Sequence, residues 1–174
     1  MFRYFQMWNQ WIVILISSFV FASALTTRAA ECVATTDELK TMEARKIALT
    51  RKDAPVLYFS VKVADDTHER SAGFQHVCPE IVERIPILFV FSKPTQPWFH
   101  MRNVHAPLDI AFLDETGRIT EIQHMAVYPS TPEKRDIQHY RPRAPISGAL
   151  EAYLGFFESL GVTAGNASIN FRNQ

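Results

Sequence analysis

Residues 108–125 read Leu-Asp-Ile-Ala-Phe-Leu-Asp-Glu-Thr-Gly-Arg-Ile-Thr-Glu-Ile-Gln-His-Met, and this stretch decides the fold class. Its first half alternates Leu108, Ile110 and Phe112 with Asp109, Ala111 and Leu113, which is the period of a strand. Gly117 ends a polar turn, because glycine adopts positive φ without strain, and the remaining residues return as a second strand. The stretch therefore predicts a β-hairpin within a mainly β domain.

The rest of the chain adds short strands and little helix. All 10 prolines lie between Pro55 and Pro145, which excludes long helices from the middle of the chain. Alternating or continuous apolar runs predict further strands over residues 46–50, 56–64, 87–91, 97–101, 146–151 and 167–171.

Two segments predict short helices. Asp66 with Glu69 three residues later forms a capping-box pattern, and this helix would run to about Gly73 or Gln75. A second helix is predicted over residues 153–160. The predicted fold is mainly β (α+β): a compact, partly closed barrel or sandwich of about eight short strands with two small helices. A parallel βαβ architecture is not expected.

The first 30 residues have the pattern of a secretory signal peptide. Arg3 lies near the start, no Asp or Glu precedes Glu31, and residues 11–25 are apolar apart from serines. As a helix this apolar block would span roughly 22 Å, less than the ~30 Å hydrocarbon core of a membrane. We predict export to the periplasm or the extracellular space. The alternative is an uncleaved anchor in the inner membrane, which would then be the protein's only contact with the membrane.

We expect a signal peptide over residues 1–30, an N-terminal extension over 31–44 and a single β-rich domain over 45–174. The chain has 18 Lys and Arg against 18 Asp and Glu, so its formal net charge is zero. Nucleic-acid binding requires a basic face to meet the phosphates, and this balance supplies none overall. We therefore predict no nucleic-acid partner.

Cys32 and Cys78 both follow the predicted signal peptide. An even number of cysteines in an exported chain favours a disulfide, which would contribute ~4 kcal/mol by closing its loop. Two alternatives remain open: two buried thiols, or a Cys78 thiolate acting beside His76.

A group of polar residues follows the predicted strand at 97–101. If the loop folds back, His100, His105 and Asp109 would reach one cation, and two nitrogens with one oxygen suit zinc or another divalent metal. The alternative is structural: Asn103 would satisfy backbone groups, Asp109 would cap the loop or pair with Arg102, and the histidines would be surface or core residues.

The long segment from residue 128 to residue 145 is the second candidate region, because loops of this length are usually functional or disordered. It carries Tyr140 and Arg141 within a basic and aromatic run that would suit an anionic or sugar-like ligand or a partner, although a solvated loop is the alternative. Glu151 lies in an apolar strand and is either a buried carboxylate with a raised pKa or a solvent-facing one. The predicted ligand-binding residues are His100, Met101, Asn103, His105, Asp109, Tyr140 and Arg141.

One set of motifs resembles a known family. Residues 98–114 read Trp-Phe-His-Met-Arg-Asn-Val-His-Ala-Pro-Leu-Asp-Ile-Ala-Phe-Leu-Asp, with Gly117 following. In chain order they are accompanied by Val-Lys-Val-Ala-Asp at 61–65, Glu-Arg-Ser-Ala-Gly at 69–73, Ile-Leu-Phe-Val-Phe at 87–91, Ala-Leu-Glu at 149–151 and Gly-Phe-Phe at 155–157. This pattern resembles the domain of unknown function 192 family of bacteria and archaea, over roughly residues 45–172.

The chain departs from the family pattern at several positions, which identifies it as a divergent member. Phe74-Gln75 replaces Leu-Met, His100 replaces Trp, Val104 replaces Thr, and Pro86 replaces Gly. The resemblance implies an exported, compact, β-rich domain. It supplies no catalytic residues, because no activity is established for the family.

Three functions are compatible with the sequence, which lacks the common nucleotide, hydrolase and redox motifs. The first is a non-enzymatic binding or accessory module for a small polar ligand or an envelope partner, using residues 98–109 and the 128–145 segment. The second is a metal-assisted enzyme built on His100, His105 and Asp109. The third is a structural role in the envelope. No cofactor follows from the sequence.

Overall fold

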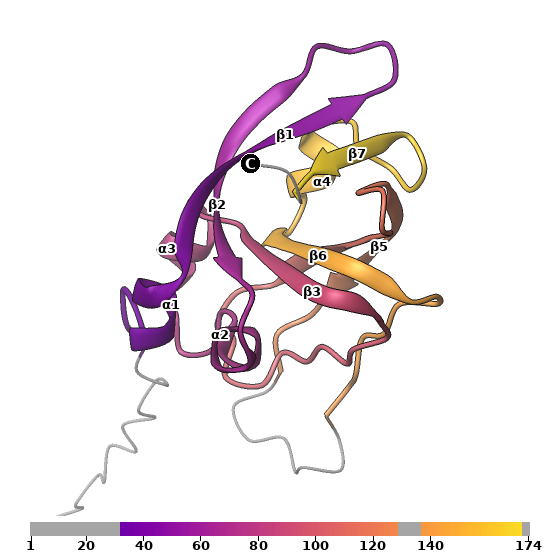
Figure 1. Cartoon of the computed structure of the whole chain (residues 1–174). Coiled ribbons are helices and arrows are strands. Elements are labelled where there is room, and N and C mark those ends of the chain that lie inside the picture. The colour runs from indigo at the N-terminus through magenta and orange to yellow at the C-terminus, as the bar shows by residue number, and fades with distance from the viewer. Residues whose placement is uncertain (1–31, 129–136, 172–174) are drawn as a thin grey trace, which may run out of the picture.

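The protein is described here by a computed structural model that covers residues 32–128 and 137–171. The predicted signal peptide and residues 129–136 of the long segment lie outside the described residues. Figure 1 shows a strongly curved sheet with short helices grouped at one side. None of the helices in the described part of the chain is long and apolar enough to cross a membrane.

Seven strands and four short helices make up the described fold. In chain order they are α1 Asp37–Thr41, β1 Glu43–Arg51, β2 Leu57–Ala64, α2 Thr67–Ala72, α3 Pro79–Val82, β3 Ile87–Thr95, β4 Leu108–Leu113, β5 Ile119–Met125, β6 Ile146–Tyr153, α4 Phe156–Ser159 and β7 Ala167–Asn170. The predicted mainly β class is confirmed.

The strands form one sheet in the order β5-β4-β6-β3-β2-β1-β7. An isolated bridge between Arg118 and Ser168 joins the start of β5 to β7, so the two edge strands of the sheet approach each other. The sheet is therefore a nearly closed barrel, in agreement with the partly closed barrel expected from the sequence.

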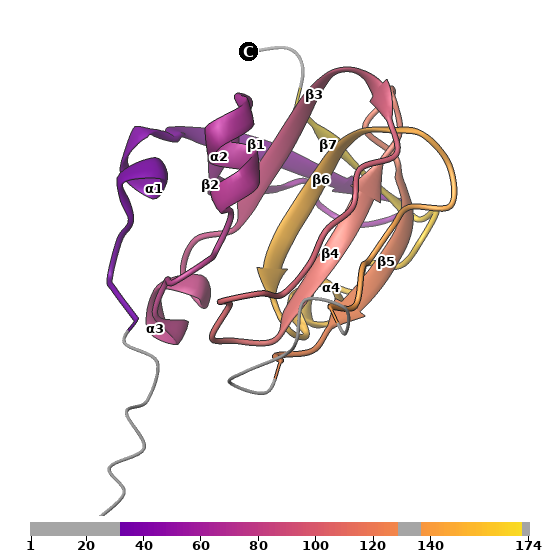
Figure 2. The same cartoon turned by 90° about the horizontal axis from the view of Figure 1, so that it is seen from below.

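Two hydrophobic clusters lie on the two faces of the sheet. The inner cluster draws side chains from all seven strands and from the α4 region; Leu150, Val61 and Ile169 are members. The outer cluster draws on β2, β3, β4, β5 and β6, and α1, α2 and α3 cover it together with the chain around Phe99. Figure 2 shows these three helices beside β1, β2 and β3, away from β4 and β5. Because strand side chains alternate, residue 151 lies opposite Leu150, on the outer face.

The structure corrects three expectations. β2 and β3 pair in parallel, with Lys62 opposite Ile87, and the crossover between them contains α2 and α3. Residues 97–101 are not a strand: only Phe99 bridges to Tyr140. The helices α1 and α3 were not predicted, and the helix expected over 153–160 shortens to α4 because β6 continues to Tyr153.

Two local predictions are confirmed. Asp66 caps α2, because its carboxylate accepts a hydrogen bond from the backbone N–H of Glu69 at 2.9 Å. Cys32 and Cys78 form a disulfide, which fastens the N-terminal extension beside α3. The predicted domain boundary at residue 45 falls inside β1.

Candidate functional site

A cavity of about 490 Å³ opens on the outer face of the sheet, between α2, β3 and the chain that follows β3. We call it the outer pocket. Its polar lining residues are Thr67, Arg70, Ser71, Gln75, His100, Arg102 and Glu151, and its apolar ones are Ala72, Gly73, Phe89, Phe91, Pro97, Trp98 and Phe99. Convergent polar groups against aromatic walls are typical of small-molecule sites.

Glu151 is the most deeply buried ionisable group of the outer pocket. It lies on the outer face of β6, between Ile87 of β3 and Ile110 of β4, and is only 6% exposed. Within the described residues, no hydrogen bond or ion pair satisfies its carboxyl group. Burial raises the pKa of Glu151 to about 8, so the group is mostly uncharged at neutral pH.

The end of α2 brings backbone close to this carboxyl group. Gly73 caps the helix with φ +48°, a conformation that glycine tolerates best. A Cβ atom at this position would lie 3.7 Å from Oε2 of Glu151 and 3.4 Å from the ring of Phe89. The glycine therefore leaves space above the carboxyl group at the base of the outer pocket.

Arg70 holds α2 against β3. Its guanidinium donates hydrogen bonds to the carbonyl oxygens of Asp65 and, at 3.1 Å, of Val90, and it lies 5.6 Å from the centre of the Phe91 ring. Because these contacts fix the side chain, its positive charge is held in place at the wall of the outer pocket.

His100 and Arg102 form the opposite wall. Burial and the nearby charge of Arg102 lower the pKa of His100, so the imidazole is neutral at pH 7. Its Nδ1 accepts a hydrogen bond from the backbone N–H of Arg102 at 3.4 Å, which leaves the Nε2 proton to donate. The guanidinium of Arg102 makes no hydrogen bond or ion pair with residues 32–128 or 137–171.

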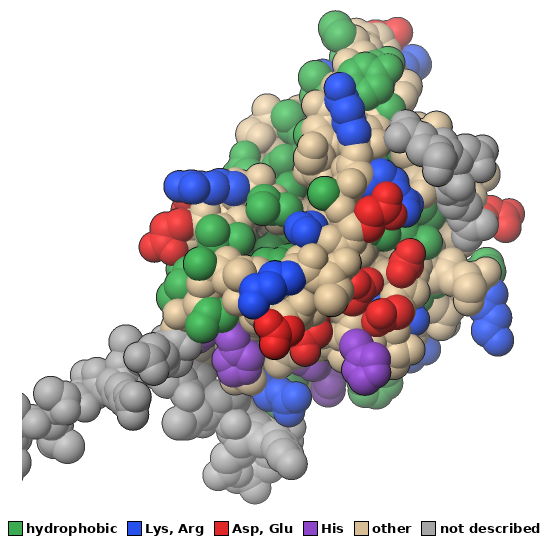
Figure 3. Space-filling model, turned by 60° about the vertical axis from the view of Figure 1, so that its left-hand side comes forward, with side chains coloured by type: hydrophobic (Ala, Val, Ile, Leu, Met, Phe, Trp, Pro, Cys, Tyr) green, Lys and Arg blue, Asp and Glu red, His purple; other side chains and the backbone are tan. Residues whose placement is uncertain are grey.

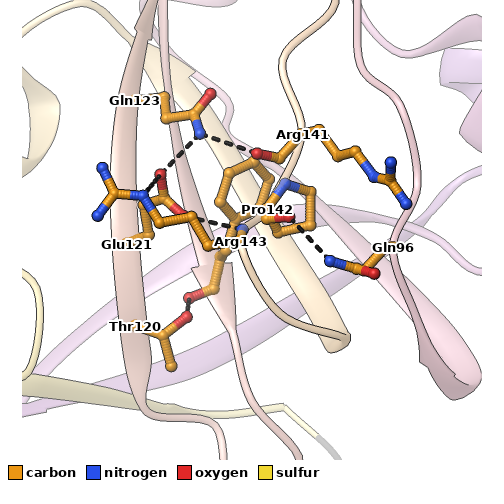
Figure 4. Close-up of polar contacts among 8 residues, drawn as sticks. Gln96, Thr120, Glu121, Gln123, Arg141, Pro142 and Arg143 are labelled. Atoms are coloured by element: carbon orange, nitrogen blue, oxygen red, sulfur yellow. Dashed lines mark hydrogen bonds and ion pairs between the residues drawn. The ribbon is translucent and has the colours of Figure 1, made fainter.

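An exposed aromatic stack borders the outer pocket. Trp98 is 61% exposed, its ring centre lies 4.8 Å from that of His139, and the guanidinium of Arg141 lies 5.8 Å from the indole. Figure 4 shows how the segment carrying Arg141 is held: the Nε2 atoms of Gln123 and Gln96 donate to the carbonyl oxygens of Arg141 and Pro142, at 3.0 and 3.2 Å. The stack is thus fixed to β5 and to the residue that follows β3.

The residues predicted to bind a ligand do not form one site. His100 lines the outer pocket, and Arg141 lies at its border. Met101 and Tyr140 are buried in the outer hydrophobic cluster. Asn103 adopts positive φ, its carbonyl oxygen accepts from the backbone N–H of His76 at 2.7 Å, and its side chain contacts the His76 ring.

The three residues predicted to bind a metal are not brought together. Asp109 is buried and pairs with Nδ1 of His124 at 2.5 Å, not with Arg102, and it also accepts from the backbone N–H of Gly155. Among the residues that the structure describes, none is a hydrogen-bond partner of the buried Nε2 of His105. Across the described ranges, no group of three His, Cys, Asp or Glu side chains is arranged to hold a metal ion.

The sequence interpretation missed Arg70, Gly73 and Arg102 as site residues, because they become neighbours only through the parallel crossover and the chain after β3. Glu151 did carry a signal, since an acidic residue inside an apolar strand is unusual, but the sequence left its orientation open. The structure resolves that alternative in favour of burial.

Charges of both signs are mixed on the face seen in Figure 3. Lys and Arg side chains lie beside Asp and Glu side chains there, with histidines at the lower edge. This face therefore lacks the continuous basic surface that a nucleic-acid backbone requires.

Comparison with solved structures supports the fold. A protein of unknown function from Novosphingobium aromaticivorans DSM 12444 superimposes with a TM-score of 0.64 at 22% identity, covering 84% of this chain and 99% of that one. A protein from Sinorhizobium meliloti 1021, provisionally described as a transcription regulator, gives a TM-score of 0.63 at 22% identity, covering 74% and 94%. At this identity the likeness concerns the fold alone.

No curated protein is significantly similar to the chain in sequence. The sequence pattern of the DUF192 family, described as "Uncharacterized ACR", matches residues 47–168. This range contains β2 to β6 and most of β1, and it includes Arg70, Arg102 and Glu151 of the outer pocket. The chain therefore belongs to the DUF192 family of uncharacterised proteins, as its central motifs suggested.

Proposed function

We propose that this protein is an exported binding module that takes a small polar ligand in the outer pocket. The observation that carries the proposal is the carboxyl group of Glu151, which is buried at a cavity and has no protein partner among the described residues. Burying an unpaired polar group costs free energy, so such a group is a common sign of a ligand or water that completes its hydrogen bonds.

The surroundings of Glu151 support binding of a molecule with a flat or apolar body. Phe89, Phe91 and Trp98 supply aromatic surface, while Arg102 and Nε2 of His100 supply donors. Aromatic faces bind the apolar part of a ligand, and a few fixed donors determine its orientation. Arg70 is held by contacts within the protein, so binding would mainly order the side chain of Arg102.

A small-molecule screen on the exported, purified protein tests this proposal. We expect ring-bearing polar compounds to raise the melting temperature, because a ligand that binds only the folded state stabilises it. Trp98→Ala and Arg102→Ala should reduce the shift, and Tyr58→Ala, on exposed β2 surface outside the outer pocket, should leave it unchanged. Shifts that persist in both pocket variants would place the ligand elsewhere and refute the proposal.

Export is supported by the composition of residues 1–30 and by the disulfide, which is typical of oxidising compartments. A fusion of the chain to alkaline phosphatase, which is active only after export, tests this part of the proposal. We expect phosphatase activity in cells. An inactive fusion that remains in the cytoplasm would contradict it.

A further inference from the structure

We propose that the ligand of the outer pocket is a small carboxylate anion that accepts a hydrogen bond from the protonated carboxyl group of Glu151 and pairs with Arg102. This inference rests on the proposed function and names the ligand class. It follows from the geometry at the base of the outer pocket and from the balance of charge around it.

The base of the outer pocket offers a hydrogen-bond donor. Glu151 is flanked by Ile87 and Ile110 on the neighbouring strands, and Phe89 and Gly73 border the space above it, so none of these side chains stabilises a charged carboxylate. Burial raises its pKa to about 8, and the protonated form that results at neutral pH has an O–H to donate. A ligand carboxylate is the matching acceptor, and hydrogen bonds to charged acceptors are stronger than neutral ones.

The charge of the lining favours an anion. Arg70 from α2 and Arg102 from the chain after β3 both line the outer pocket, while His100 is neutral because burial and Arg102 lower its pKa. The residues of β3 and β4 paired with Glu151 are not ionisable. With Glu151 protonated, the lining therefore carries positive charge that no acidic side chain in it offsets.

A cation is the competing occupant, because aromatic rings and a carboxylate also bind ammonium groups. Such a ligand would have to ionise Glu151 and to lie beside Arg70 and Arg102, and like charges in a partly buried site repel strongly. The lining thus disfavours a cation and leaves an anion with an apolar body as the better match.

The test compares three probes of similar shape: benzoate, neutral benzamide and benzyltrimethylammonium. We expect the Kd of benzoate to be at least tenfold lower than that of benzamide at about pH 7, a ratio set by charge-assisted hydrogen bonds. Between about pH 7 and about pH 9, benzoate affinity should fall about tenfold, because the protonated fraction of Glu151 falls by that factor when its pKa is about 8.

Two variants test which residue causes each effect, and a third serves as the control. In Glu151→Gln, which cannot ionise, the ratio of benzoate affinities between the two pH values should approach one. In Arg102→Ala, the preference for benzoate over benzamide should shrink, whereas Arg143→Ala, which removes a cation that pairs with Glu121 outside the outer pocket, should keep it. As a direct measurement, the 13C carboxyl signal of Glu151 in the unsubstituted protein should titrate at higher pH when benzoate is bound.

The outcomes separate this inference from the proposed function. Equal binding of benzoate and benzamide, lost in Trp98→Ala, would refute the anion and leave the outer pocket as a binding site. Tighter binding of benzyltrimethylammonium, with Glu151 titrating at lower pH, would show a cation site and overturn the inference. Absence of benzoate binding would also overturn it, while stabilisation by other compounds in the screen would still support the proposed function.

Discussion

At the scale of single residues, Glu151 links the stability of the fold to pH. Its folded-state pKa of about 8 lies above the ordinary value of 4.5, so the folded protein holds this proton more tightly than the unfolded chain does. The resulting stabilisation is fully present below about pH 4.5 and is lost as the pH rises towards 8, by an amount on the order of 5 kcal/mol.

We predict that Glu151→Gln removes most of this pH dependence. Urea unfolding of both proteins between about pH 5 and about pH 8.5 should show a flatter profile for the variant, because its amide does not ionise in this range. Glu121→Gln, which changes the carboxylate that pairs with Arg143 outside the outer pocket, is the control, and its pH profile should follow that of the unsubstituted protein. Parallel profiles for Glu151→Gln and the unsubstituted protein would mean that Glu151 is ionised in the fold.

The Asp109–His124 pair joins a buried carboxylate to an exposed imidazole. Asp109 is 1% exposed and His124 is 71% exposed, as measured on their side chains. We predict that Asp109→Ala lowers the free energy of unfolding by about 2–4 kcal/mol, because the backbone N–H of Gly155 also loses its acceptor. His124→Ala should cost less than about 1 kcal/mol, as exposed ion-pair partners usually do. Equal losses in urea unfolding would contradict this assignment.

At the scale of elements, Gly117 controls the closure of the barrel. Its φ is +83°, its carbonyl oxygen accepts from the backbone N–H of Ile169 at 2.8 Å, and a Cβ atom there would lie 2.1 Å from the carbonyl oxygen of Ile169. The glycine thus allows the β4–β5 turn to touch β7.

We predict that Gly117→Ala lowers the free energy of unfolding by roughly 3 kcal/mol or more, from backbone strain and a steric clash together. Gly155→Ala is a matched control, because its φ is +87° but no atom lies within 4 Å of the added Cβ; it should cost only about 1 kcal/mol. Urea unfolding measures both. Similar losses for the two variants would show that strain alone, and not contact with β7, governs Gly117.

The elements that the sequence predicted well have strong local signals. β4 follows from the alternation of Leu108, Ile110 and Phe112, and α2 follows from the Asp66 cap. Residues 97–101 failed as a strand because only Phe99 pairs, while Phe99 and Met101 pack in the outer cluster and Trp98 is exposed. The parallel pairing of β2 with β3 left no local signal, because it is set by packing between distant segments.

At the scale of the whole molecule, the disulfide ties the N-terminal extension to the domain. The cysteines are 46 residues apart, and closing such a loop stabilises the fold by about 4 kcal/mol on the chain-entropy account. We predict that Cys32→Ser with Cys78→Ser, or reduction by dithiothreitol, lowers the free energy of unfolding by about this amount. Unfolding in urea with and without reductant measures the effect, and an unchanged midpoint would contradict it.

The outer pocket is formed by segments that lie far apart in the chain, and for this reason the sequence predicted only part of it. His100 came from a cluster that is local in sequence, but Arg70, Phe89 and Glu151 come from three separate elements. Their meeting depends on the parallel crossover, which the alternation of single strands does not encode. The short apolar runs of the sequence predicted a mainly β barrel or sandwich, whereas the site depends on the strand order.

The most direct measurement of the central claim is a backbone amide chemical-shift map of the purified protein titrated with benzoate. Binding in the outer pocket should shift the amide signals of Gly73, Phe89, His100 and Glu151, which come from four separate segments of the chain. Shifts centred instead on Leu154, in a second cavity next to Tyr153, or no shifts at all, would contradict the assignment of the outer pocket as the site for a small carboxylate.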